Sequence, residues 1–181
     1  MSQVVLERVI TLLKEFTRER KSRLEVILLG GLALQYYGMK DRATVDVDAE
    51  VKGDLAGLFQ FLKHNHIPGD LGENISGWSV IAMPPGYRER VINVYQDDLL
   101  EVKVLSPLDL IIAKLRRFAE EDIEDALFIA RKYVIKAEEI QRSAEEAIRH
   151  SVKDTTLFMF RENVQLFLEK MNTHSERSPR L

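Results

Sequence analysis

Residues 24–52 read LEVILLGGLALQYYGMKDRATVDVDAEVK, and most of the expected architecture follows from them. A run of leucine and β-branched residues, Leu24–Leu29, is typical of a buried strand and ends in Gly30-Gly31. The next residues, Leu32–Tyr37, have helical spacing. Ala43–Val51 then alternates strictly between apolar and polar side chains, which predicts a strand with one polar face. The segment therefore predicts a strand, a tight turn, a helix and a second strand.

The hydrophobic period on either side of this segment predicts further elements. One helix is expected before it, at Val4–Phe16, and another after it, which Asp54 caps and which ends between His64 and Gly69. The hydrophobic period then returns to two, which predicts three short strands at Trp78–Met83, Arg90–Tyr95 and Leu100–Leu105. Because the connections between them are short, we expect antiparallel hairpins. Helical spacing then returns in four segments: 106–118, Ile123–Tyr133, Lys136–His150 and Thr155–Asn172.

These elements predict an α+β fold with a mixed sheet of about five strands, flanked by helices and followed by a helical C-terminal third. We expect one α+β domain over residues 1–135 and C-terminal helices over 136–172 that pack on it. The polar residues 173–181 are expected to form a disordered tail.

The composition of the 181-residue chain limits its chemistry. The chain contains no cysteine, which excludes disulfides, thiolate metal sites and cysteine nucleophiles, and leaves any metal to oxygen and imidazole ligands. The 26 Lys+Arg and 29 Asp+Glu residues give a net charge of -3, so the chain as a whole is not a basic surface for nucleic acid. It has no apolar stretch of membrane-spanning length and no secretory signal, so we expect a cytoplasmic protein with no membrane partner.

Two features of residues 24–52 point to chemistry. A glycine pair at a helix N-terminus lets the backbone approach a ligand, and the unpaired N–H groups there favour phosphate. Asp46 and Asp48 lie two residues apart on the predicted strand, so their carboxylates point the same way and suit Mg²⁺. Plainer interpretations stay open: Gly30-Gly31 as a close-packed turn, and the aspartates as part of a solvated sheet face.

Longer motifs resemble a known superfamily. Residues 30–38, GGLALQYYG, and residues 42–48, RATVDVD, look like the signature of the nucleotidyltransferases related to DNA polymerase β. Residues 106–115, SPLDLIIAKL, with DIED at 122–125, resemble a later motif of the abortive-infection toxin-type nucleotidyltransferases and their uncharacterised bacterial relatives. The resemblance implies a nucleotidyltransferase-like fold.

The resemblance also implies a mechanism. Mg²⁺ held by Asp46 and Asp48 would bind the triphosphate of an NTP such as ATP, an acceptor hydroxyl would attack the α-phosphorus, and pyrophosphate would leave. The nucleotide-binding residues are then expected to be Gly30, Gly31, Arg42, Thr44, Lys114 and Asp122. The acceptor, whether RNA, protein or a small molecule, stays open. The toxin-type motif extends the resemblance to a toxin–antitoxin pair with a cognate protein partner.

The sequence departs from the superfamily at the third carboxylate, which active members usually supply from a later strand. This chain has Asn93 there, so Glu101 on the following strand is assigned the catalytic role, with Glu50 beside Asp48 as an alternative. The departure leaves two other functions open: a catalytically degenerate binding or regulatory protein of the same fold, and an acidic-faced protein without nucleotide chemistry. Lys114 and Asp122 are equally compatible with ordinary helix charges.

Overall fold

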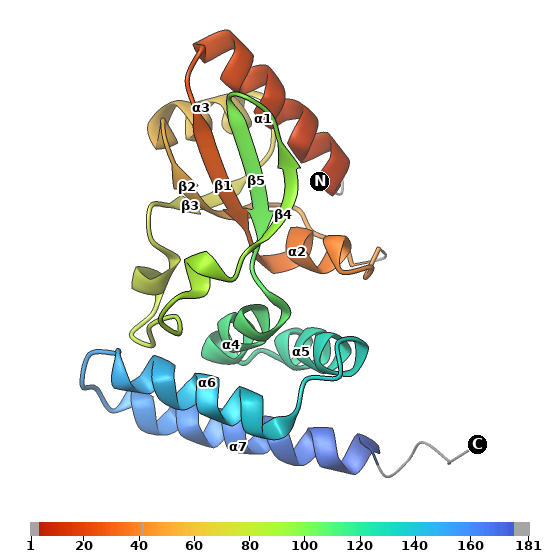
Figure 1. Ribbon diagram of the computed structural model, residues 1–181, viewed down its shortest axis with the longest axis vertical. Coiled ribbons are helices and arrows are strands. Elements are labelled where there is room, and N and C mark those ends of the chain that lie inside the picture. Colours follow the sequence, from red (N-terminus) through yellow and green to blue (C-terminus); the bar gives the residue numbers. More distant parts are fainter. Residues whose placement is uncertain (1–3, 41, 176–181) are drawn as a thin grey trace. The chain divides into compact units, whose positions relative to one another are not determined.

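The computed structural model describes residues 4–40 and 42–175, and the described chain forms two compact units. The first unit comprises the residues up to Ile75 together with Arg88–Ser106, and the second comprises Ser76–Tyr87 together with the residues from Pro107 onward. The first unit contains the whole sheet, and the second is helical (Figure 1). The predicted α+β class is confirmed.

The sheet of the first unit has five strands in the order β3-β2-β1-β5-β4. Central β1 pairs antiparallel with β2 and parallel with β5, while β2–β3 is parallel and β4–β5 antiparallel, so the sheet is mixed as predicted. The strand bounds are β1 Leu24–Leu28, β2 Val47–Lys52, β3 Gly69–Gly72, β4 Ile92–Gln96 and β5 Leu100–Val104.

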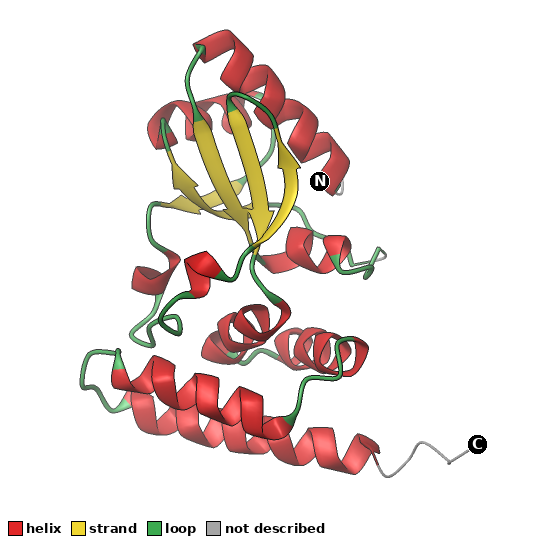
Figure 2. Cartoon of the chain, in the orientation of Figure 1, coloured by secondary structure: helices red, strands yellow, loops and turns green. Residues whose placement is uncertain are grey.

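Two helices of the same unit cover one face of the sheet (Figure 2). They are α1, Leu6–Arg20, and α3, Leu55–His64. Phe16 of α1 is fully buried and meets Phe61 of α3 with ring centroids 5.4 Å apart. Asp54 caps α3 as predicted, because its carboxylate accepts a hydrogen bond from the Gly57 N–H at 2.9 Å.

The opposite face of the sheet carries a polar surface. Along β2 the residues on this face are Asp48, Glu50 and Lys52, since side chains on a strand alternate between its two faces. The register places Ile27 of β1 beside Glu50 and Glu25 beside Lys52, so the surface continues onto β1. Helix α2, Gly30–Tyr36, follows β1 at the end of the sheet nearest Asp48.

The second unit is built from four helices, α4 Pro107–Arg117, α5 Glu120–Lys132, α6 Ala137–Arg149 and α7 Thr156–Ser175. Its core contains Ile111 and Leu115 of α4, Ile129 of α5, Ile140 of α6 and Phe167 of α7, all fully buried. Each helix therefore turns one apolar stripe inward, as the helical spacing predicts. Helix α7 continues to Ser175, and the rest of the tail predicted to be disordered lies outside the described residues.

The predicted strand at Trp78–Met83 is wrong. Residues 75–78 form a single-turn helix, η1, and the following segment is irregular. Its backbone donors are satisfied by hydroxyl groups rather than by a neighbouring strand: Ala82 N–H donates to Ser151 Oγ at 2.8 Å and Met83 N–H to Ser76 Oγ at 2.9 Å. The fifth strand is instead β3, where the sequence predicts only a break after α3.

The predicted strand at Ala43–Val51 begins too early, because β2 starts only at Val47. The preceding residues use their polar groups elsewhere: the Thr44 carbonyl accepts from the Val4 N–H at 2.8 Å, and the Thr44 hydroxyl donates to Asp46. Val45 is correspondingly 45% exposed, whereas Val47 is buried. Within residues 4–40 and 42–175, no helix has the length and hydropathy to span a membrane.

Candidate functional site

The turn between β1 and α2 requires glycine at its first position. Leu29 is extended, with φ -134°, and Gly30 follows at φ +59°, a left-handed conformation that side chains rarely adopt. A Cβ atom added to Gly30 would lie 2.0 Å from Asp48 Oδ2. The carboxylate of Asp48 therefore lies directly against the backbone at the start of α2.

The second glycine of the pair holds Thr44 in the same way. A Cβ atom on Gly31 would lie 2.5 Å from the Cβ atom of Thr44, whose side chain is buried. The Thr44 hydroxyl donates to Asp46 Oδ1 at 3.0 Å. Consecutive glycines thus bring Asp48 directly, and Asp46 through Thr44, to the start of α2. The space above both glycines is filled by the chain itself, as the close-packed interpretation of the pair expects.

The two aspartates reach this position by different means. Asp48 belongs to the ladder of the sheet: its carbonyl accepts from the Leu29 N–H at 3.0 Å, and it pairs with Asp70 of β3. Asp46 precedes β2, so no ladder fixes it and its carboxylate depends on Thr44. The expected alternation on one strand therefore explains only Asp48, whereas the glycine pair explains why both lie together.

Sequence reasoning missed one residue at this end of the sheet. Gln35 of α2 hydrogen-bonds the backbone of Arg42 and of Val4 and Leu6 at the start of α1, so it supports the loop that leads to Asp46. The sequence marks Gln35 only as an amide side chain that directly follows the apolar residues Leu32–Leu34. Arg42 itself is at this loop, where its carbonyl accepts from Gln35 at 3.3 Å.

None of the candidates for a third carboxylate joins the aspartates. Glu50 is 6% exposed and accepts from Arg88 Nε at 2.5 Å and from the Ile75 N–H at 2.9 Å, so it is occupied in an internal ion pair. Glu101 pairs in register with Glu25, four residues along β1 from the level of Asp48, which is about 13 Å at 3.3 Å per residue. Asn93 lies on the edge strand β4 and bonds Gln96 instead.

Glu101 belongs to a separate charged cluster. Lys103 Nζ lies 2.7 Å from Glu101 and 2.6 Å from Glu25, and it bridges the two strands. The hydrogen bond from Lys103 and its positive charge hold the pKa of Glu101 below its ordinary value. Glu101 is thus ionised and paired with Lys103, which also contacts Glu25 on the neighbouring parallel strand β1.

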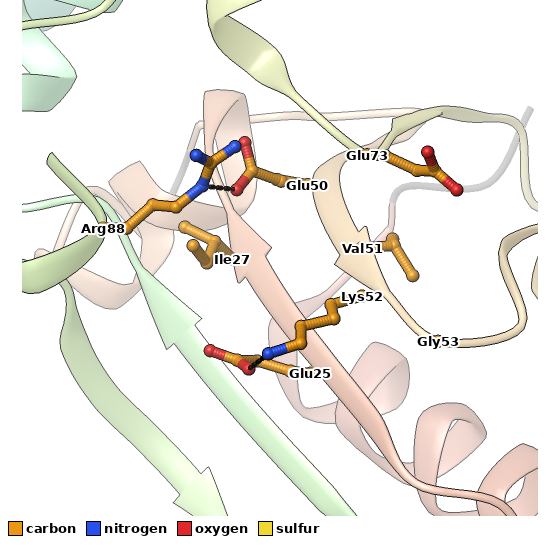
Figure 3. A pocket seen from close by; sticks show the side chains of 8 residues that line it. All are labelled: Glu25, Ile27, Glu50, Val51, Lys52, Gly53, Glu73 and Arg88. Atoms are coloured by element: carbon orange, nitrogen blue, oxygen red, sulfur yellow. Dashed lines mark hydrogen bonds and ion pairs between the residues drawn. The ribbon is translucent and has the colours of Figure 1, made fainter.

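The polar sheet face contains a cavity of about 380 Å³ (Figure 3). Glu50 and Arg88 form an ion pair at one side, and Glu25 and Lys52 form a looser one, 3.9 Å between charged atoms, at the other. Exposed Glu73 also lines the cavity. Because Glu50 is the next residue after Asp48 on this face of β2, the cavity begins about 7 Å from the position of Asp48 along the strand.

Lys114 and Asp122, the expected contacts in the later motif, bond one another inside the second unit. Lys114 Nζ lies 3.1 Å from Asp122 and 2.8 Å from Asp125, and all three side chains are buried. Arg117 Nε also contacts Asp122 at 2.6 Å, and Asp122 accepts from the Ala119 N–H at the start of α5. Burial alone would raise the pKa of Asp122, but the hydrogen bonds and charges of Arg117 and Lys114 outweigh it and lower the pKa.

The carboxylates at the start of α2 fit Mg²⁺ bound together with a nucleotide. The described residues contain no group of three or more His, Cys, Asp or Glu side chains that would hold a metal by themselves. Mg²⁺ commonly takes one or two protein carboxylates and completes its shell with phosphate oxygens and water. Asp46 and Asp48 supply that partial donor set, held at the start of α2 by the glycine pair and Thr44.

Comparison with known families places the chain in one of them. A family described as a nucleotidyltransferase of unknown function matches residues 5–165, so the chain belongs to the nucleotidyltransferases. Its particular family is the one designated DUF6036. The superfamily expected from the sequence motifs is confirmed. No curated protein and no solved structure matched the chain.

Proposed function

We propose that the protein is a cytoplasmic, Mg²⁺-dependent nucleotidyltransferase that transfers a nucleoside monophosphate from an NTP to an acceptor hydroxyl. One observation carries the proposal: Gly30 and Gly31 have no side chain because Asp48 and Thr44 occupy that space, which brings two carboxylates to one end of the sheet. A pair of carboxylates against a helix start, in a chain of this family, is suited to binding a metal–triphosphate complex.

Each residue then has a defined task. Asp46 and Asp48 would hold Mg²⁺, which when bound neutralises charge on the triphosphate. Thr44 orients Asp46 through its hydroxyl, and Gly30 keeps Asp48 close to the backbone. The acceptor oxygen forms a bond to the α-phosphorus, the bond from that phosphorus to pyrophosphate breaks, and the acceptor proton passes to water. Positioning and charge neutralisation supply most of the catalysis in reactions of this kind.

The cavity on the polar sheet face supports a small polar acceptor. The cavity begins at Glu50, two residues after Asp48 on β2. Both acidic and basic side chains line it, among them Glu73, Lys52 and Arg88. A polyanion would meet the carboxylates as well as the cations, and the net charge of -3 adds no long-range attraction for it. We expect Glu73→Gln to raise the KM for the acceptor while the KM for the NTP stays unchanged.

Transfer of label distinguishes this reaction from others. With Mg²⁺ and NTP labelled at the α-phosphorus, the wild-type protein should label an acceptor and release pyrophosphate, whereas label at the γ-phosphorus should not transfer. Asp46→Asn and Asp48→Asn should each abolish labelling. Asp98→Asn, on an exposed turn of the same unit, is the matched control and should label normally. Labelling by Asp48→Asn at the wild-type rate would refute the assignment.

The toxin-type motif supports a role in a toxin–antitoxin pair. If the activity is toxic, expression of the wild-type chain should arrest bacterial growth and Asp48→Asn should not. Lys114 and Asp122 stay predicted nucleotide contacts on the resemblance alone, because their mutual ion pair explains their placement without a ligand.

The second candidate is a catalytically degenerate nucleotidyltransferase fold with a binding or regulatory function. The positions of Glu50, Glu101 and Asn93 favour it, since none of them adds a carboxylate to Asp46 and Asp48. Calorimetry separates the two candidates: an enzyme binds NTP only in the presence of Mg²⁺ and loses that binding in Asp48→Asn. A chain that binds neither metal nor nucleotide is not the enzyme.

A further inference from the structure

The side-chain amide of Gln35 connects three separate segments of the first unit. Its Nε2 donates to the Val4 carbonyl at 3.0 Å and to the Arg42 carbonyl at 3.3 Å, while its Oε1 accepts from the Leu6 N–H at 3.0 Å. Both donor hydrogens and the acceptor oxygen of the amide are thus used. Gln35 joins α2 to the start of α1 and to the loop that precedes β2.

The same loop is held a second time, two residues further on. The Val4 N–H donates to the Thr44 carbonyl at 2.8 Å, so Val4 is bonded through its carbonyl to Gln35 and through its N–H to Thr44. Arg42 and Thr44 are therefore tied to one framework, whose centre is the Gln35 amide. The framework ends at Asp46, because the Thr44 hydroxyl donates to the carboxylate.

Asp46 depends on this framework more than Asp48 does. The ladder of β2 begins at Val47, so the sheet fixes Asp48 but not Asp46. The described residues between α2 and β2, 37–40 and 42–46, form neither helix nor strand, and a segment of that kind keeps one conformation only if its backbone groups are bonded elsewhere. The bonds to Gln35 and Val4 meet that need.

We propose that Gln35 is a positioning residue of the metal site: it fixes the loop that presents Thr44 and Asp46 to a bound divalent cation. The proposal rests on the proposed function for the identity of the ligand. Outer partners that orient metal-binding side chains commonly change metal affinity 10–100-fold when they are removed. Gln35→Met keeps the length of the side chain and removes all three hydrogen bonds. Gln35→Glu keeps an acceptor for Leu6 and removes both donors.

A matched control is available on the same helix segment. The hydroxyl of buried Tyr37, the residue after α2, donates to the carbonyl of Leu105, the residue after β5, and not to residues 42–46. Tyr37→Phe removes a buried hydrogen bond from the same region, and it leaves the framework around Gln35 intact. A merely structural role for Gln35 predicts that the two variants behave alike toward metal.

The test is titration with Mn²⁺ as a probe for Mg²⁺, both without nucleotide and with a non-hydrolysable NTP analogue whose own Mn²⁺ binding is subtracted, followed by the electron paramagnetic resonance signal of the free ion. We expect at least about tenfold weaker Mn²⁺ binding in Gln35→Met and in Gln35→Glu, and wild-type affinity in Tyr37→Phe. Hydrogen exchange at residues 42–48 should speed up in both Gln35 variants and not in Tyr37→Phe. This second readout requires neither metal nor activity, and it shows whether the loop has loosened in a folded chain.

The outcomes separate the inference from the proposed function. If Mn²⁺ binds the wild-type chain and is lost in Asp48→Asn, but binds Gln35→Met as tightly as Tyr37→Phe, the positioning role is wrong and the metal site stands. If the wild-type chain binds no Mn²⁺ either without or with the NTP analogue, the metal site of the proposed function is wrong and Gln35 cannot position it. Unchanged exchange at residues 42–48 in Gln35→Met would also overturn the inference.

Discussion

Replacing Gly30 by alanine perturbs the structure in two ways that add. The φ of +59° costs an alanine about 1–2 kcal/mol, because its Cβ atom crowds the following carbonyl oxygen. The new Cβ atom would also lie 2.0 Å from Asp48 Oδ2, so Asp48 must leave its rotamer at a cost of about 0.5–1.5 kcal/mol. The expected loss in the free energy of unfolding is therefore about 1.5–3.5 kcal/mol.

A double-mutant cycle separates the two costs. In an Asp48→Ala background the carboxylate is gone, and Gly30→Ala should cost only the backbone part, about 1–2 kcal/mol. Urea unfolding of the four proteins measures both values, and Gly77→Ala is the control, since a Cβ atom there meets no atom within 4 Å. If Gly30→Ala costs the same with and without the Asp48 carboxylate, the two groups do not touch and the geometry derived for the site is wrong.

Three further measurements test other parts of the structure. Asp54→Ala should destabilise the chain by about 1 kcal/mol in urea unfolding, and Asp54→Asn by less, because the amide still caps the Gly57 N–H. Lys114→Met should cost about 3–5 kcal/mol by leaving Asp122 and Asp125 buried without their shared cation, and adding Asp125→Asn should recover part of that loss. The lowered pKa of Asp122 contributes stability above the unfolded pKa of about 3.9, and this contribution is lost as the pH falls through the folded value. Stability measured at decreasing pH below about 4 should therefore fall less steeply in Asp122→Asn than in the wild-type chain.

The elements predicted correctly are those whose local pattern and tertiary environment agree. Leu24–Leu28 is apolar except for Glu25, includes the β-branched Val26 and Ile27, and is central in the sheet, while the strong amphipathic pattern of α6 is matched by its buried stripe. Trp78–Met83 is apolar apart from Ser79, as a buried strand can be, but it pairs with no strand among the described residues and its donors go to serine hydroxyls. Gly69–Gly72 has no strand-forming pattern, and only its pairing with β2 makes it a strand.

The site was predictable to the extent that it depends on residue type. The glycine pair and the Asp-x-Asp pattern draw attention to Gly30, Gly31, Asp46 and Asp48 by residue type, and the longer motifs around them give the resemblance to the superfamily. Their contacts could not be derived in the same way, because the alternation assigns Asp46 to a strand and the actual support comes from Thr44. Gln35 is bonded to Val4, which is 31 residues away in the sequence, and no local sequence pattern predicts a contact between residues so far apart along the chain.

The parallel pairing of β1 with β5 constrains the order in which the chain can fold. Strand β1 ends at Leu28 and β5 begins only at Leu100, so one edge of a strand with four fully or nearly buried apolar residues stays unpaired while the intervening chain is made. Such an edge is a template for pairing with other chains, and closing so long a connection is slow. During refolding, aggregation should therefore compete with the insertion of β5, and a chain cut before Leu100 should associate with copies of itself through the exposed edge of β1.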